Sequence, residues 1–349
     1  MTIYQDSKRI VGTNTDKVGA PAISGGWKEL GRTTLGSANA SMNTTSLSDK
    51  RYYMILTNSL GYSGVANSNI RFNSDSGSNY AERVSVSGGT DTTGTGYNFA
   101  SFAHGNTATE NFGVGYLSNL SSKEKLWTSH NIRQNTAGAG NAPIRSESVG
   151  KWANTTNEVS GIDILTGAST THDSGSETVI LGYDPDDTHT DNFWEELADV
   201  TLSGASSSLD SGTITAKKYL WYQVFIKKNS ASNNYAEHSI NGITTGNTWA
   251  RRISSNGGTD GTNTSQNTMN TTDTGAGGYF LNGFVINSSG NEKLFIEHVI
   301  QNTSSGVNAP DRKEIVMKST TSAQITQLTV TGATNGYDSG SFIKVWGSN

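Results

Sequence analysis

Four aspartates lie close together in the polar stretch DPDDTHTDN at residues 184–192: Asp184, Asp186, Asp187 and Asp191. Carboxylate oxygens are ligands that Ca²⁺ prefers, so the stretch is a candidate for weak calcium binding. Its spacing differs from that of an EF-hand loop, and acidic, polar, proline-containing sequence is typical of a solvated linker. We therefore expect a linker, with these aspartates as the weak metal candidate and with no cofactor elsewhere.

Two similar stretches, YAERVSVSGGTD at 80–91 and WARRISSNGGTD at 249–260, each join an arginine to Gly-Gly-Thr-Asp. Glycine supplies positive φ and aspartate folds back onto nearby backbone N–H groups, so each stretch predicts a strand followed by a turn. The functional alternative is a loop at a domain rim that contacts a glycan or a neighbouring subunit. The interaction candidates on that alternative are Arg83, Asp91, Arg252 and Asp260. A phosphate-binding loop is disfavoured because no strand–helix unit follows.

Histidine recurs at matching positions in KEKLWTSHNI (123–132) and NEKLFIEHVI (291–300), as His130 and His298. Neither has a second histidine or a carboxylate at a convincing metal-ligand spacing, so both are predicted to be structural. An arginine and a glutamate also recur two positions apart, which places them on one strand face and favours cross-strand ion pairs exposed to solvent. These are Arg145 with Glu147 and Arg312 with Glu314.

Catalytic signatures are missing from the sequence. It has no nucleophile elbow, zinc-binding helix or Walker loop. Paired carboxylates for glycoside hydrolysis would have to come from distant strands, and nothing points to a particular pair. Trp27 and Trp194 begin equivalent segments and are predicted to be core residues rather than platforms for stacking a ligand. We expect no enzyme.

The elements that must position these residues occur twice. Collinear matches at a nearly constant offset indicate tandem duplication of one domain. The pairs include WKELGRTTL (27–35) with WEELADVTL (194–202), NAPIRSESV (141–149) with NAPDRKEIV (308–316), and TGASTTHDSGSETVILG (166–182) with TGATNGYDSGSFIKVWG (331–347). We expect a first module at 25–183, an acidic linker at 184–192 and a second module at 193–349. Residues 1–24 precede both copies as an arm, in which Tyr4 and Arg9 are interaction candidates.

Composition favours an all-β fold. Only 33% of residues are hydrophobic, and Gly, Ser, Thr and Asn abound, yet 7 Trp, 13 Tyr and 10 Phe argue against disorder. Short apolar runs bounded by turn residues read as strands, and no segment keeps a helical period. These are 51–59, 124–132, 176–183, 218–226, 292–300 and 341–347. Eight to ten strands per module predict two antiparallel β-sandwiches, most simply jelly rolls, behind a short N-terminal arm.

Charge and targeting features exclude further classes. A net charge of −5 gives no reason to expect nucleic-acid binding or attraction to an anionic membrane. The absence of cysteine removes disulfides, thiolate metal sites and cysteine nucleophiles. The longest apolar stretch, YLWYQVFI at 219–226, is too short to insert in a bilayer, and the N-terminus has no signal-peptide core. We expect a chain made in the cytoplasm.

The segments WKELGRTTL, DKRYYMIL, NYAERVSVSGGTD and DSGSETVILGY, each echoed in the second copy, resemble jelly-roll repeats in structural proteins of tailed phages and archaeal viruses. The opening TIYQDSKRIVG resembles the beginnings of such virion proteins. The resemblance covers essentially the whole chain. It implies a non-enzymatic virion component, a decoration, spike or fibre subunit, anchored by its arm and forming a homo-oligomer, with a trimer preferred.

Alternatives to that role remain. A double jelly-roll major capsid protein predicts large lateral interfaces and assembly into shells or sheets. A glycan-binding or glycan-cleaving virion protein, directed at a host-surface glycan, predicts an aromatic-lined groove at a rim. In the cleaving case, that groove should hold two carboxylates about 5–9 Å apart. A purely cytoplasmic scaffold is the last option.

Overall fold

The computed structural model describes residues 3–5, 8–11, 23–24, 26–167, 169–185, 187–189, 191–229, 235–272, 277–302 and 307–349. Of residues 3–5, 8–11, 23–24, 106 and 188–189 it describes the backbone alone. Two compact units divide the chain. One holds Ile144–Phe193 and the residues before Thr136, and the other holds Thr136–Pro143 and Trp194–Asn349. The described part of the chain contains no helix able to cross a membrane.

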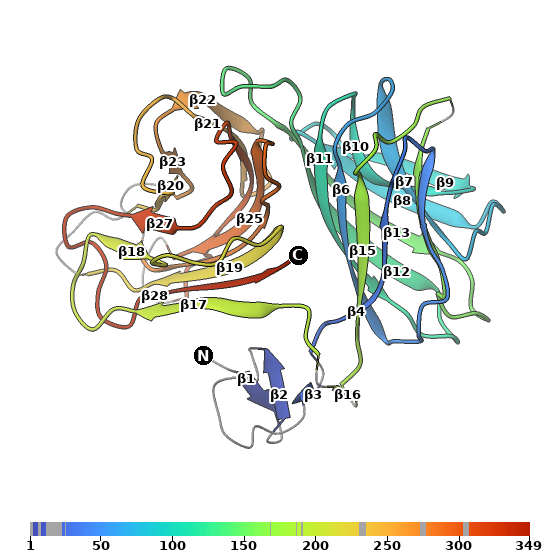
Figure 1. Cartoon of the computed structure of the whole chain (residues 1–349), viewed down its shortest axis with the longest axis horizontal. Helices are drawn as coiled ribbons and strands as arrows, with labels where there is room; N and C mark the ends of the chain where they lie inside the picture. The colour runs from blue at the N-terminus through green and yellow to red at the C-terminus, as the bar shows by residue number, and fades with distance from the viewer. Residues whose placement is uncertain are drawn as a thin grey trace. The chain divides into compact units, whose positions relative to one another are not determined.

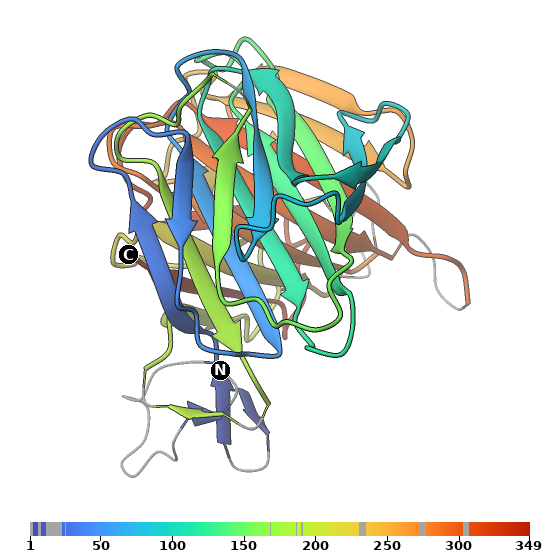
Figure 2. The ribbon, with the colours of Figure 1, turned by 90° about the vertical axis from the view of Figure 1, so that its right-hand side faces the viewer.

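The first module is a sandwich of two antiparallel sheets (Figures 1 and 2). The larger sheet has eight strands in the order β4 (Lys28–Thr34), β15 (Glu177–Tyr183), β6 (Tyr52–Ser59), β11 (Asn111–Ser118), β12 (Lys125–Arg133), β13 (Ile144–Trp152), β8 (Tyr80–Val86) and β9 (Thr92–Tyr97). The smaller sheet has four: β10 (Ala100–Thr107), β7 (Ala66–Phe72), β14 (Ile162–Thr166) and β5 (Ser41–Thr44).

The second module repeats this order strand for strand. Its larger sheet runs β17 (Glu195–Thr201), β28 (Phe342–Ser348), β19 (Tyr219–Ile226), β24 (Tyr279–Ile286), β25 (Lys293–Gln301), β26 (Asp311–Ser319), β21 (Trp249–Ser255) and β22 (Gly261–Gln266). Its smaller sheet runs β18 (Ser208–Asp210), β27 (Leu328–Thr331), β20 (Glu237–Ile240) and β23 (Met269–Asn270). The all-β fold with duplicated antiparallel sandwiches is therefore confirmed.

From β4 to β8 the chain alternates between the two sheets, which is the kind of connection that a jelly roll uses. Each module has twelve described strands rather than the eight to ten expected. The extra strands include short or polar ones, such as β9 and β23, that carry too few apolar residues to be recognised in the sequence. All six segments read as strands from their apolar runs are strands, to within a residue or two at each end.

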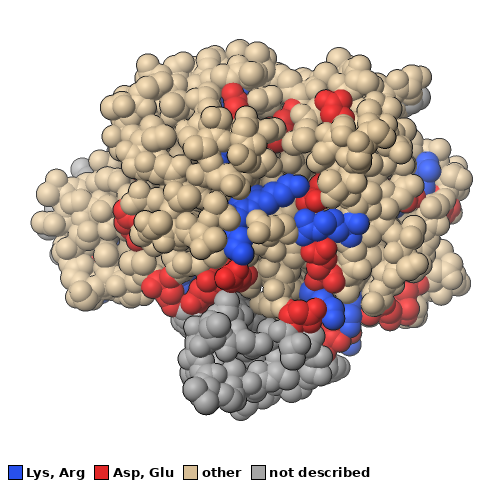
Figure 3. All heavy atoms as spheres, viewed as in Figure 1, with Lys and Arg blue, Asp and Glu red and all other residues tan. Residues whose placement is uncertain are grey.

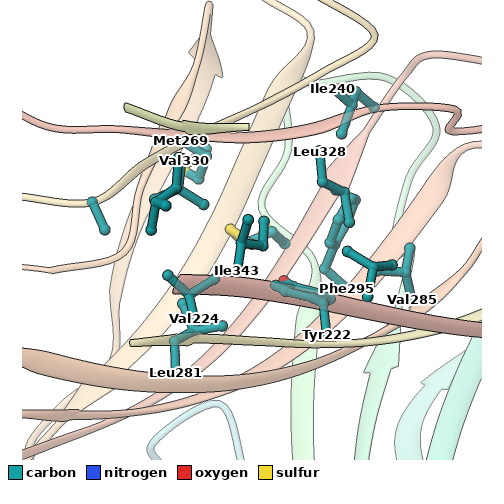
Figure 4. Packing of buried hydrophobic residues seen from close by; sticks show 14 of the residues in the cluster. Tyr222, Val224, Ile240, Met269, Leu281, Val285, Phe295, Leu328, Val330 and Ile343 are labelled. Carbon is teal, nitrogen blue, oxygen red and sulfur yellow. The ribbon is translucent and has the colours of Figure 1, made fainter. Parts of the chain in front are cut away.

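The core lies between the two sheets of each module. Figure 4 shows part of the second core, where Tyr222 and Val224 from β19 and Phe295 from β25 pack with Leu328 and Val330 from β27. Alternate residues of a strand point to opposite faces, so the core takes every second side chain of these strands. The first core is built in the same way; its members include Tyr53, Ile55, Leu117, Trp127, Ile164 and Ile180.

The segments outside the sandwiches also pair. β1 (Ile3–Gln5) and β2 (Lys8–Val11) form an antiparallel hairpin in which Tyr4 lies opposite Arg9. β3 (Ile23–Ser24) runs parallel to β2 and antiparallel to β16 (Thr188–His189) of the linker. Strands from the expected arm and from the linker therefore share one small sheet (Figure 1).

Candidate functional site

An open groove of about 520 Å³ lies at one end of the larger sheet of the first module. Five strands adjacent in that sheet, β4, β15, β6, β11 and β12, begin or end there. Its volume is within the range of small-molecule sites. The lining residues are Trp27, Tyr52, Tyr53, Tyr116, Leu117, Ser118, Leu126, Trp127, Thr128 and Tyr183.

Strand register explains why residues so distant in the sequence meet. Tyr183 lies opposite Tyr52, and Tyr52 lies opposite Ser118, whose partner on the other side is Leu126. In the next row on the same face, Tyr116 lies opposite Thr128. This is the face turned away from the core, because the core takes the intervening residues such as Tyr53.

The aromatic rings of the groove support one another. The Trp27 ring centroid lies 5.6 Å from that of Tyr183 and 6.4 Å from that of Tyr116. The Tyr52 and Tyr183 rings stack at 6.0 Å with planes 24° apart. Tyr52 and Tyr116 remain 39% and 38% exposed. Exposed aromatic rings held in fixed positions are typical of binding surfaces.

The groove exposes an almost entirely apolar surface and contains no ionised group. None of its ten lining residues carries a carboxylate, imidazole or amine. Burial, followed by the neighbouring Tyr52 and Asp184, raises the pKa of Tyr183, so this phenol stays neutral at physiological pH. Acid–base or metal chemistry is therefore not available from these side chains, and binding is what the arrangement can do.

Trp27 contributes to this groove, whereas the sequence predicted a core position for it. Its carbonyl accepts a hydrogen bond from the Phe193 N–H at 2.8 Å, and its ring is half-buried. The equivalent Trp194 is buried, as expected, and its ring lies 5.8 Å from Trp221 and 6.2 Å from Phe284. The prediction was right for Trp194 and wrong for Trp27.

The repeated Gly-Gly-Thr-Asp stretches are turns that begin one residue earlier than their glycines. Ser87 and Gly88 have φ of 50° and 73°, and Asn256 and Gly257 have φ of 53° and 74°. In each case the N–H of the following glycine donates to a carbonyl three residues back, at 2.9 Å. Two central residues with positive φ make this a type I′ hairpin turn, which suits the twist of the strands it joins.

The four interaction candidates at these turns do not form a matched site. Arg83 of β8 and Asp91, the residue before β9, are both exposed and pair with each other at 3.5 Å. Arg252 instead donates through Nε to the carbonyl of Pro143, in the same unit, at 2.8 Å. Asp260 is half-buried. What the two modules share here is the geometry of the turn.

A smaller hollow of about 320 Å³ lies beside the first turn and includes Thr90 and His104. Burial lowers the pKa of His104, and the nearby Arg133 guanidinium lowers it further. His104 is therefore neutral at physiological pH.

The recurring histidines lie opposite glutamates on the neighbouring strand. His130 pairs in register with Glu147, and His298 pairs in register with Glu314. His130 Nε2 lies 3.4 Å from Glu147 Oε1.

The predicted cross-strand, solvated ion pairs are wrong for Arg145. Its Nη1 contacts Glu147 at 2.6 Å along the same strand, and its side chain is only 3% exposed. In the second module Arg312 Nε lies 3.3 Å from Glu314, again along one strand, with the arginine 60% exposed.

The linker aspartates that the structure describes do not converge. Asp187 pairs with Lys50 at 2.5 Å, and Asp191 pairs with Lys28 at 3.4 Å. No three carboxylates of the described linker residues lie within 4.8 Å of one another. Asp186 is outside the described residues, as are the side chains of Tyr4 and Arg9. Asp187 and Asp191 are thus engaged with lysines of the first module.

Sequence reasoning missed a buried polar cluster in the second core. Glu297 is fully buried; its Oε1 accepts a hydrogen bond from the Tyr222 hydroxyl and lies 3.4 Å from His238 Nε2. Burial raises the pKa of Glu297 to about 8 and lowers that of His238 to about 3. The available signal was the placement of Glu297 between Phe295 and Val299 on one face of β25.

A second missed feature recurs in both modules. Lys125 Nζ donates to the carbonyls of Ser121, Lys123 and Asn154, and the lysine is fully buried. Lys293, at the equivalent position of β25, donates to three carbonyls in the same manner, those of Ser288, Asn291 and Ser322. Three carbonyls satisfy the three donors of an ammonium group, so each lysine ties loops to the start of a strand.

Comparisons with known proteins add little to this picture. No family model matches the chain, and no curated protein matches it. Domains LG4-5 of the mouse laminin alpha1 chain are 9% identical with a TM-score of 0.21, over 93% of this chain and 92% of that one. Neisserial surface protein A is 8% identical with a TM-score of 0.11, over 80% and 96%.

Proposed function

We propose that the chain is a non-enzymatic virion structural protein of the decoration, spike or fibre type. The proposal is supported by the duplicated sandwich and by the resemblance of its segments to virion jelly-roll repeats. A second candidate, glycan binding by a virion protein, is favoured by the aromatic groove of the first module. Figure 3 is in keeping with both, because most of the face in view is neither acidic nor basic.

The observation that carries the proposal is the nature of what the two modules share. Duplicated domains that keep one task keep the residues that perform it. Here the matched features are loop anchors, namely the type I′ turns and the buried Lys125 and Lys293. Asn73 and Asn241 belong with them, since each has positive φ and accepts backbone N–H bonds from the same neighbouring loop. These features stabilise a scaffold.

Catalysis is not supported by any described constellation. The groove has no carboxylate pair of the kind that glycoside hydrolysis uses. Glu297, the acid with a strongly raised pKa, is enclosed in a core where no substrate could reach it. His130 has a side chain only 8% exposed. The groove thus offers the glycan-cleaving alternative no carboxylate pair, whereas glycan binding does not need one.

Light scattering of the purified chain over a range of concentrations tests the structural role. We expect a closed homo-oligomer, with a trimer preferred. Growth into shells or sheets would favour the double jelly-roll capsid protein instead. A monomer at all concentrations would count against both.

A chain lacking residues 1–24 tests anchoring by the arm. We expect the modules to stay folded, because the sandwich strands begin at β4, while β16 loses its partner β3. Attachment to the other virion proteins should be lost. Thermal unfolding of the truncated chain at the full-length temperature is the control for folding, and retained attachment would contradict the assignment of the arm.

A further inference from the structure

The groove at the end of β4, β15, β6, β11 and β12 has a shape and chemistry that name a ligand class. We propose that it binds a neutral hexopyranose unit of a glycan, stacked on the aromatic rings. This inference deepens the second candidate function and depends on it, but not on the position of the protein in a virion.

The aromatic rings of the groove provide the surface on which a sugar ring can stack. A pyranose presents a face of C–H groups, which is apolar, and hydroxyls around its edge. The stacked Tyr52–Tyr183 pair, with Trp27 against Tyr183, offers an apolar surface with a matching character. Half-exposed rings that already contact one another lose little conformational freedom when a ligand is added.

The residues that line the groove also carry hydroxyl groups. The exposed surface of the groove is nevertheless almost entirely apolar; the lining residues with hydroxyls include Tyr52, Tyr116, Tyr183, Ser118 and Thr128. A hydroxyl both donates and accepts hydrogen bonds, so it suits the hydroxyls of a sugar. The groove therefore offers a sugar mainly an apolar surface for its C–H face, with few hydrogen bonds, which agrees with weak binding.

None of the ten lining residues is ionised, which argues against sialic acid, uronic acids and sulfated sugars, because their anionic groups would lose water without gaining a cation. A groove of about 520 Å³ takes one or two sugar rings rather than a long chain. We therefore expect weak binding at one site, strengthened when an oligomer presents several copies.

The second module has different side chains at the position that corresponds to the groove. By strand register, Trp221 and Trp346 of β19 and β28 stand where the first module has Met54 and Leu181. Trp221 stacks on Phe284 at 5.8 Å with planes 11° apart, and lies 5.0 Å from Trp346. Phe284 stands where the first module has Tyr116, so this hydroxyl is absent. The site is assigned to the first module alone.

The test uses the full chain and saturation-transfer NMR with methyl α- and β-pyranosides of glucose, galactose and mannose. An array of neutral and acidic oligosaccharides and the apolar phenol p-cresol serve as further probes. We expect binding of at least one neutral sugar, with the ring protons of Tyr52 or Tyr116 in contact. Binding of acidic glycans only, of p-cresol only, or of no probe would overturn the proposal.

Variants locate the site. Tyr52→Ala should weaken sugar binding by roughly fivefold or more, because it removes one stacked ring. Tyr116→Phe keeps the ring, removes one hydroxyl and should weaken binding by a smaller factor. Tyr97→Ala is the matched control, since Tyr97 is 45% exposed on β9 and does not line the groove. Unchanged affinity in both groove variants, with unchanged melting temperature, would overturn the site. A trimer that binds no sugar would leave the structural role intact.

Discussion

Replacing Glu297 by Gln should change how the stability of the second module depends on pH. The carboxyl is fully buried, and it faces the Tyr222 hydroxyl and the His238 imidazole, with the Arg251 guanidinium acting on it from β21. Glutamine keeps the size and an acceptor for Tyr222 but cannot ionise. The comparison therefore isolates one proton.

The magnitude follows from the pKa shifts. Burial raises the pKa of Glu297 from 4.5 to about 8, so the stability it contributes is complete below pH 4.5 and is lost as the pH rises through 8. A shift of this size corresponds to about 5 kcal/mol, at about 1.4 kcal/mol per unit. Burial lowers the pKa of His238 from 6.5 to about 3, so its contribution is complete above pH 6.5 and is lost as the pH falls through 3.

Between pH 4.5 and 6.5 the two effects have opposite slopes and cancel. We expect the wild-type module to have a plateau of stability there and to weaken on either side. In Glu297→Gln the acidic decline should remain, because His238 is unchanged, while the alkaline decline attributable to this group disappears. The difference in stability between variant and wild type should shift by about 4 kcal/mol, in favour of the variant, from pH 5 to pH 9.

Guanidinium unfolding followed by tryptophan fluorescence at pH 5, 7 and 9 measures this difference. Glu195→Gln is the matched control in the same module, because Glu195 is 52% exposed and pairs with Lys217 on the surface. A difference between Glu297→Gln and wild type that stays within about 1 kcal/mol over this range would refute the reasoning. It would mean that Glu297 is ionised throughout, as an ion pair with a protonated His238.

Two further predictions concern the features shared by both modules. Lys293→Met should lower the free energy of unfolding in chemical denaturation by about 2–3 kcal/mol, since three partly buried carbonyls lose the donor they share with a buried lysine. Its control is Lys151→Met, at a 44% exposed side chain, which should change this free energy by under 1 kcal/mol. Gly257→Ala should lower the free energy of unfolding by about 1–2 kcal/mol in thermal unfolding, because φ is 74° there. Its control is Gly261→Ala, where φ is not positive and an added Cβ would lie an ordinary 3.6 Å from Ile253. Equal effects of the two substitutions would contradict the turn assignment.

Local pattern was sufficient for much of the scaffold. A strand is recognised by a short run of apolar residues with period two, and the duplication doubles that signal, so segments such as 219–226 and 293–301 were found at nearly their true bounds. The polar strand β22, GTNTSQ, has no such pattern; it is a strand because β21 offers it a partner. Pairing across strands is not encoded in the residues of one strand alone.

The sequence by itself determined the fold class, the two copies, the turns after β8 and β21 and the placement of Glu297 on the same strand face as Phe295 and Val299. It could not tell which face of β25 enters the core, and so it did not reveal that this carboxyl is buried. The groove was also beyond it, because Trp27, Tyr52, Tyr116 and Tyr183 belong to four strands or strand ends separated by long stretches of chain. Only the order and register of the strands in the sheet bring these rings together, and both are set by the packing of the whole module.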